Sequence, residues 1–252
     1  MDEQAMSDLK KLLDRPPVHN GDFFAWFRTI SSLLMNRFAL SYGSEKARMT
    51  ELEFYYHDNP YLEEERSDSV HPDDTSHRNE LQSRFATWYF HHTGVYKHSG
   101  YKNLDYTGLD LCFGNRNTTF GILIRAIEVI EPALPPKEQY IYGPSSLLLK
   151  QIFPALGLTP IRSGKRKIEN RPLYLAMMRE IEEGDLFYHD LIRLIPQTYN
   201  DPEPVYAAPR IGLNPRRAYS KHPYRFLIRP DKKHLEKGKI RAYMHTHPPF
   251  NI

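Results

Sequence analysis

The chain has 252 residues, of which 40% are hydrophobic and 26% charged, and its formal net charge is +3. These proportions are close to the averages for globular proteins, and the apolar runs are too short to cross a bilayer, which excludes a membrane protein. The length suits one hydrophobic core, so we expect a soluble single domain over residues 21–252, preceded by a helical extension over residues 1–20.

Two helices are predicted at the start of the chain. Residues 5–13 place leucines at helical spacing, and Pro16 and Pro17 end that segment. Between residues 22 and 38, apolar side chains recur at steps of three and four, which indicates an amphipathic helix whose apolar face lies in the core.

A strand is predicted over residues 48–56, because the spacing of apolar residues changes to two. One face would carry Leu52, Phe54 and Tyr56, and the other Glu51, Glu53 and Tyr55. A charged surface loop is expected to follow over residues 57–79. Residues 118–128 are the strongest strand signal, with Phe120, Ile122 and Ile124 on one face and Leu123, Arg125 and Ile127 on the other.

The second half of the chain predicts mixed elements. Gly143 to Ser146 are typical of a turn entering a helix over residues 147–153. Residues 173–194 show helical spacing with a break near Gly184, and residues 224–229 indicate a last strand.

The N-terminus and the cysteine content bear on the compartment. The first residues contain no basic segment leading into an apolar one, which argues against secretion. The single cysteine, Cys112, excludes an internal disulfide and is typical of a reducing compartment. We therefore expect a protein of the cytoplasm, including the nucleoid, or of the nucleus.

Charge is unevenly distributed along the chain. Acidic residues dominate from residue 51 to 81, whereas residues 210–241 are strongly basic. A basic tract of this kind can neutralise phosphates of a polyanion, or it can be a solvated surface or an interaction tail. Composition alone leaves these interpretations open.

Motifs for metals and nucleotides are weak or missing. His245-Thr246-His247-Pro248 is similar to a zinc-binding His-x-His-Pro if it lies on a strand, but no downstream serine and aspartate follow it. His91-His92 and His98 lack companion ligands, and no glycine-rich phosphate loop or serine nucleophile motif occurs. We expect neither a metal nor a cofactor.

Four segments, in order, resemble the alkyladenine (3-methyladenine) DNA glycosylase family. Glu51-Leu52-Glu53-Phe54-Tyr55 resembles its Glu-Thr-Glu-Ala-Tyr strand, and Gly121 to Glu128 its strand ending Leu-Leu-Arg-Ala-Leu-Glu. Gly143-Pro144-Ser145-Ser146-Leu147 resembles its Gly-Pro-Ser-Lys-Leu helix entry. Arg210-Ile211-Gly212 and Pro223-Tyr224-Arg225-Phe226 resemble its Arg-Val-Gly and Pro-Leu-Arg-Phe. The resemblance spans residues 48–229 and rests on the collinearity of these motifs.

The resemblance implies an α+β domain with a mixed, mostly antiparallel, curved sheet flanked by helices. It also implies hydrolysis of the N-glycosidic bond of a flipped base, with Glu53 activating water and Arg125 orienting the carboxylate and the water. Tyr55 would stack on the base, and either His71 or His77 would supply the family's histidine.

The chain departs from the family in the tyrosine-rich segment and in the asparagine that follows it. Here Tyr101, Tyr106 and Asp110 would line the pocket instead, although a strand-end aspartate can also simply cap a turn. Arg210, Arg216, Arg217 and Lys221 would bind DNA, double- or single-stranded. We expect a monomeric monofunctional DNA glycosylase of base excision repair. The alternatives are a non-catalytic nucleic-acid-binding module and a hydrolase of free nucleosides or nucleotides.

Overall fold

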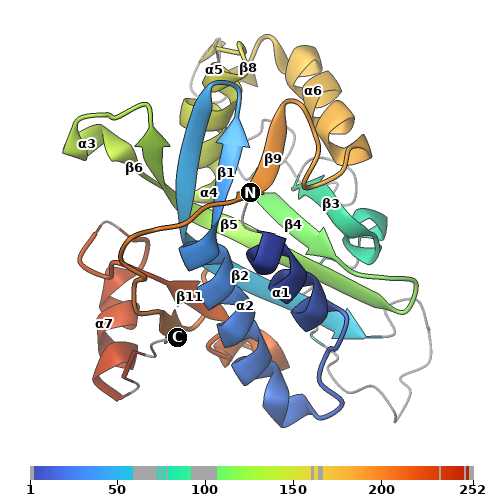
Figure 1. The fold of residues 1–252 in the computed structure, drawn as a ribbon, viewed down its shortest axis with the longest axis vertical. Coiled ribbons are helices and arrows are strands. Elements are labelled where there is room, and N and C mark those ends of the chain that lie inside the picture. Colours follow the sequence, from blue (N-terminus) through green and yellow to red (C-terminus); the bar gives the residue numbers. More distant parts are fainter. Residues whose placement is uncertain are drawn as a thin grey trace.

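The computed structural model describes residues 3–58, 73, 75, 77, 79–91, 107–159, 162–163, 167–232, 234–246 and 248–249. Over these residues the chain has an α+β fold around one open sheet, with a separate ribbon of β7 (Arg162–Ser163) and β8 (Lys167–Ile168) (Figure 1). Every strand pairing described in the sheet is antiparallel. The predicted α+β class is therefore confirmed, whereas the described strands contain no parallel pair to make the sheet mixed.

Two long strands form the centre of the sheet. These are β2 (Glu45–Asp58) and β5 (Thr118–Glu131), which pair along nearly their whole length and contain both strands predicted from the sequence. The main path runs β10 (Tyr206–Ala208), β11 (Arg225–Leu227), β2, β5, β4 (Leu109–Phe113) and β3 (Phe85–Phe90). Three strands lie off this path. Strand β1 (Phe38–Tyr42) pairs with the first residues of β2 and with β9 (Ile192–Pro196), and β6 (Tyr140–Tyr142) pairs with the last part of β5.

The N-terminal helices cover one face of the sheet. Helix α2 (Phe23–Arg37) packs on β2, and its Phe27 ring lies 5.0 Å from Phe54 and 5.9 Å from Phe120 between centroids. Aromatic pairs of this kind contribute about 0.5–1.5 kcal/mol each beyond their buried area. Helix α1 (Glu3–Leu13) packs against α2, with Ala5 and Leu9 fully buried in the same core.

The other helices are short except for α6 and α7. They are α3 (Pro136–Gln139), α4 (Pro144–Leu147), a π-helical turn (Leu148–Ile152), α5 (Phe153–Ala155), α6 (Arg171–Glu183) and α7 (Lys237–Thr246). Turns of 3₁₀ helix occur at Asn20–Asp22, Glu80–Ser83 and Ala218–Lys221. A turn over residues 143–146 and a helix over residues 147–153 were predicted, but helix α4 already begins at Pro144 and gives way to the π turn at Leu148. Pro154 offers no N–H to continue a regular ladder.

Two of the strands that the sequence did not predict, β1 and β9, contain residues that continue helical patterns. Phe38 was assigned to the preceding helix but begins β1, and Ile192 to Leu194 were assigned to a helical segment but lie in β9. The predicted break near Gly184 is confirmed, since α6 ends at Glu183. The two missed strands pair with each other, so a tertiary contact overrides the local periodicity.

The described helices include none that is both long and apolar enough to span a membrane.

Candidate functional site

Two β-bulges lie where Arg125 of β5 contacts the acidic face of β2. Leu52 pairs with Ile124 and Glu51 with Ala126, which leaves Arg125 as the extra residue of β5, and Thr50 is the extra residue of β2 between Met49 and Glu51. A bulge changes the alternation of side chains along a strand. Ile127 was predicted to share the face of Arg125, but it lies in the hydrophobic core, because the extra residue at Arg125 shifts the alternation of the side chains that follow it in β5.

Glu53 lies at the centre of a buried cluster of hydrogen-bond donors. Its Oε2 accepts from the Tyr55 hydroxyl at 2.9 Å and from Arg125 Nη1 at 3.1 Å, and its Oε1 accepts from the backbone N–H of Ile211 at 2.9 Å. The side chain is fully buried. Of the residues predicted at positions 53, 55 and 125, Glu53 therefore contacts both of the others directly.

Three cationic or imidazole groups surround the neighbouring carboxylate. Glu51 Oε1 lies 2.8 Å from Arg225 Nε and 3.3 Å from Arg125 Nε, and Glu51 Oε2 lies 2.6 Å from His234 Nδ1. Burial works to raise the pKa of Glu51, but the His234 hydrogen bond and the two arginines outweigh it, so the pKa is lower than usual. The carboxylate is thus kept ionised inside the protein.

The carboxylates of Glu51 and Glu53 raise the pKa of Arg125, and Glu53 also raises that of Tyr55. Burial opposes the charge on Arg125, but Glu53 and Glu51 raise its pKa above the usual value. Burial and the charge of Glu53 raise the pKa of Tyr55 well above its ordinary range. Tyr55 therefore remains a hydroxyl donor towards Glu53 at any physiological pH.

Arg210 does not belong to the DNA-binding surface that was predicted for it. It is 3% exposed, its Nη1 lies 2.7 Å from Asp73 Oδ2, and its guanidinium carbon lies 4.7 Å from the centre of the Tyr55 ring. Its Nη1 and Nη2 also donate to the carbonyls of Phe54 and Tyr219. These contacts hold Arg210 inside the protein next to the Tyr55 ring, so that its guanidinium cannot reach a phosphate. Arg216, Arg217 and Lys221, by contrast, are exposed.

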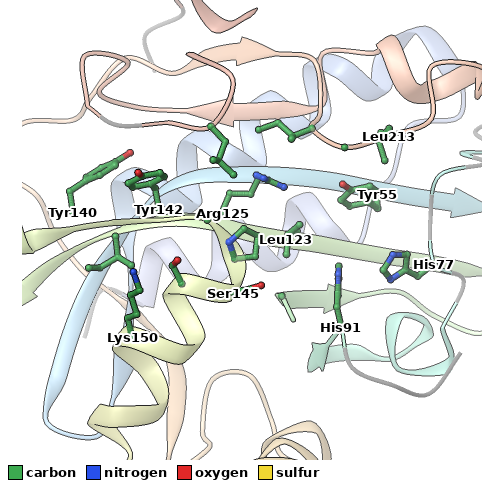
Figure 2. A pocket seen from close by; sticks show the side chains of 18 residues that line it. Tyr55, His77, His91, Leu123, Arg125, Tyr140, Tyr142, Ser145, Lys150 and Leu213 are labelled. Atoms are coloured by element: carbon green, nitrogen blue, oxygen red, sulfur yellow. The ribbon is translucent and has the colours of Figure 1, made fainter. Parts of the chain in front are cut away.

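A cavity of about 720 Å³ opens over this face of the sheet. Figure 2 shows Tyr55, His77 and His91 at one end, Arg125 and Leu123 in the middle, and Tyr140, Tyr142 and Lys150 at the other end. The remaining lining residues are Gly108, Ile141, Gly143, Pro144, Ser145, Ser146, Ile211, Gly212, Leu213 and Leu235. Glu53 is not part of the wall; it lies behind Tyr55 and Arg125.

A second carboxylate lies in the same row of the sheet as Glu53. Leu123 pairs with Glu53 on one side and with Asp110 of β4 on the other, and residues opposite each other project on the same face. Asp110 is fully buried behind His91, whose Nε2 lies 2.9 Å from Asp110 Oδ1. Gln82 Nε2 donates to the other oxygen of Asp110 at 3.0 Å.

The rings of His77 and His91 are in contact at this end of the cavity, with ring centres 4.4 Å apart and planes tilted by 52°. Burial, together with the charge of His91, lowers the pKa of His77 to about 4. His77 is therefore neutral near pH 7. Of the two histidines proposed from the sequence, His77 lines the cavity, whereas His71 lies outside the described residues.

The remaining predicted residues divide into two groups. Asp110 lies behind the wall of the cavity, while Tyr101 and Tyr106 lie outside the described residues. Sequence reasoning missed His91 because it considered the His91-His92 pair only as metal ligands. It also missed Tyr140 and Lys150, which no sequence motif marks and which only the pairing of β6 with β5 and the π turn bring to the cavity.

No group of three or more metal-ligating side chains is found in the described part of the chain. The zinc interpretation of His245 and His247 needed a strand, but His245 lies in α7, and His247 is outside the described residues.

Comparison with known proteins adds one relative. No protein-family model matches the chain. The chain is 24% identical over 220 residues to uncharacterized protein L759 of Acanthamoeba polyphaga mimivirus, covering 81% of this chain and 86% of that protein. The alignment therefore extends over most of both chains.

Proposed function

We propose that the protein is a DNA glycosylase-like enzyme with the fold of the alkyladenine DNA glycosylase family. It would hydrolyse the N-glycosidic bond of a flipped, damaged or modified base, with Glu53 activating the attacking water. The observation that carries the proposal is the contact of Glu53 with both Tyr55 and Arg125 directly below the cavity. These are the three residues that the sequence resemblance selects for catalysis and base stacking.

The chemistry needs a negative charge beside the sugar. As the bond from C1′ to the base breaks, positive charge develops on the sugar, and a fixed carboxylate stabilises it while taking a proton from water. Arg125 holds the Glu53 carboxylate in place through its ion pair, and the Tyr55 ring, which lines the cavity, offers a surface for the base. The products are the free base and an abasic sugar.

One movement is required before this chemistry can occur. Glu53 Oε2 already accepts from Tyr55 and Arg125, and the carboxylate is closed off from the cavity. A water can reach Oε2 only when the Tyr55 hydroxyl swings away, which insertion of a base against the ring would cause. The energetic cost is one charge-assisted hydrogen bond, about 1.5–3 kcal/mol, which stacking of the base can offset.

The saturated, buried state of Glu53 favours a second candidate, a non-catalytic module that binds nucleic acid. In that case Glu53 serves only as a structural ion-pair partner of Arg125. The charge of Glu53 also favours the buried cation of Arg210. Both candidates bind DNA with salt-sensitive affinity through exposed residues such as Arg216 and Arg217. Only the enzyme leaves alkali-labile sites.

The test is a panel of duplex and single-stranded oligonucleotides carrying alkylated, deaminated and bulky bases, read out by alkaline cleavage. Glu53→Gln retains the shape but replaces one accepting oxygen by an NH2 group and removes the charge, and loss of the general base should lower base release by about 10²–10⁴-fold while DNA binding persists. Glu131→Gln, on an exposed side chain at the far end of β5, is the matched control. Full activity of Glu53→Gln, or no release of any base by the unaltered protein, refutes the proposal that the protein is a glycosylase that uses Glu53.

A further inference from the structure

A second cavity, of about 620 Å³, lies between the two N-terminal helices and the segment that follows β9. We call it the helical cavity; it is bordered by α1, α2 and residues 198–202, with apolar walls at Leu12, Leu33 and Pro202. These helices cover one face of the sheet (Figure 1), whereas Glu53 and the first cavity belong to the other. The volume is within the range of small-molecule sites, about 300–1,000 Å³.

The wall of the helical cavity contains a buried hydroxyl group that lacks a partner. Ser32 lies in the middle of α2, is 5% exposed and lines the cavity. Other hydroxyls of the same helix donate to a carbonyl one turn back, as Thr29 does to Ala25 at 3.0 Å. Among the described residues, Ser32 Oγ has no hydrogen-bond partner. Since a hydroxyl rotates to suit its partner, a ligand in the cavity can supply the missing bond.

The ring of Tyr199 forms another wall, and a buried cation lies behind it. The guanidinium carbon of Arg48 lies 4.2 Å from the centre of this ring, and Arg48 is 3% exposed. The Tyr199 hydroxyl donates to the carbonyl of Phe38 at 3.0 Å, which fixes the ring in place. A cation on one face draws electron density out of the ring. The side that borders the cavity therefore favours a planar group that is rich in electrons or negatively charged.

The charged side chains of the wall also favour an anion. Arg28 and Arg37 of α2 line the helical cavity, and Asp8 of α1 is the one acid among its described lining residues. Asp8 Oδ1 already accepts from Gln4 Nε2 at 2.6 Å. The two arginines are nine residues apart, so their Cα atoms are separated by about 14 Å along the helix axis. Each end of the cavity thus carries a guanidinium, the group that best matches a carboxylate or a phosphate.

We propose that the helical cavity binds a small planar aromatic molecule that carries a carboxylate or phosphate group. The ring of the ligand stacks on Tyr199, with the leucines and the proline around its edges. Its anionic group pairs with Arg28 or Arg37 and accepts from the Ser32 hydroxyl. This site shares no residue with the first cavity, so the inference does not depend on the proposed function.

The test titrates 1-naphthyl phosphate, which joins two fused rings to a phosphate, into the full chain by isothermal calorimetry. We expect saturable binding with a Kd on the order of 1 mM or lower. Inorganic phosphate lacks the rings and 1-naphthol lacks the charge, so each should bind about tenfold more weakly or less. 1-Naphthoate replaces the phosphate by a carboxylate, and saturable binding of either naphthyl anion supports the inference.

Variants locate the binding. Ser32→Ala should weaken binding of the naphthyl anion about tenfold without lowering Tm, because the unpaired hydroxyl adds nothing to the stability of the fold. Tyr199→Leu should weaken it about two- to tenfold, whereas Tyr199→Phe keeps the ring and should not. Arg28→Met or Arg37→Met should weaken it about tenfold, according to which end holds the anion. Arg193→Met, on an exposed side chain of β9, is the matched control.

Thermal unfolding without ligand shows whether each variant is folded. The inference is overturned if neither naphthyl anion binds, or if 1-naphthol binds as tightly as the anions. It is also overturned if Ser32→Ala, Tyr199→Leu and both arginine variants bind like the unaltered protein, since the probe then occupies another part of the molecule. Release of bases from oligonucleotides is measured separately. A protein that binds the anions at this site but releases no base contradicts the proposed function and leaves this inference standing.

Discussion

Replacing Arg210 by methionine tests the role that burial assigns to this residue. In the folded protein its guanidinium donates to both oxygens of Asp73 and to two backbone carbonyls, and neither side chain of the ion pair is exposed. Methionine occupies a similar volume but leaves the Asp73 carboxylate buried without its cation. Removing one partner of a buried pair costs about 3–5 kcal/mol.

That loss is measurable as a shift in the unfolding transition. For a domain of this size, about 3–5 kcal/mol lowers Tm by roughly 6–20 °C. Urea unfolding at pH 7 gives the free energy directly, and Arg216→Met is the matched control because Arg216 is exposed on the same segment. The control should change the free energy of unfolding by less than about 0.5 kcal/mol.

The double variant Arg210→Met with Asp73→Leu removes both charges and should recover part of the lost stability, because no buried charge is left unpaired. A loss below about 1 kcal/mol for Arg210→Met, together with weaker DNA binding by the folded protein, would refute the reasoning. Arg210 would then belong to the DNA-binding surface.

Three further predictions concern the histidine end of the cavity and the basic surface. Burial and His91 lower the pKa of His77 to about 4, so the unfolded chain takes up this proton at a higher pH than the native state does. The free energy of unfolding should therefore fall as pH drops from about 6.5 to about 4, by up to about 1.4 kcal/mol per pH unit, and urea titrations of His77→Gln should show a smaller slope. Gly121→Ala should cost about 1–3 kcal/mol in chemical denaturation, since its Cβ would collide with Gln82 and Asp110, and an unchanged midpoint would contradict the packing. If Arg216 and Arg217 each contact a phosphate, replacing both by alanine should reduce the slope of log affinity against log salt by about 1.8 for duplex DNA in a titration of binding, and an unchanged slope would place the interface elsewhere.

Much of the fold near the site could be predicted because local spacing determines it. Helix α2 was expected over residues 22–38 and occupies Phe23–Arg37, and the two strands expected around Glu53 and Arg125 form the centre of the sheet. In each case apolar residues recur with the period of the element on the face that lies in the hydrophobic core, which makes the element visible in the sequence.

The alternation failed where strands change register. A bulge leaves no mark in hydrophobic spacing, so Ile127, which follows the extra residue of β5, was placed on the wrong face. Arg125 was correctly placed on the face of Leu123, and both side chains line the same cavity. The strands at Phe38 and Ile192 continue helical patterns and become strands because they pair with each other.

By itself the sequence determined the α+β class and the acidic face of β2 that carries Glu53 and Tyr55. Only the tertiary structure decided that Arg210 is buried and that His91 and Asp110 form a pair opposite Glu53. Periodicity reports which side of one element faces the core, whereas ion pairs join elements far apart in the chain. Such contacts depend on strand order and register, which arise only when the whole sheet is assembled.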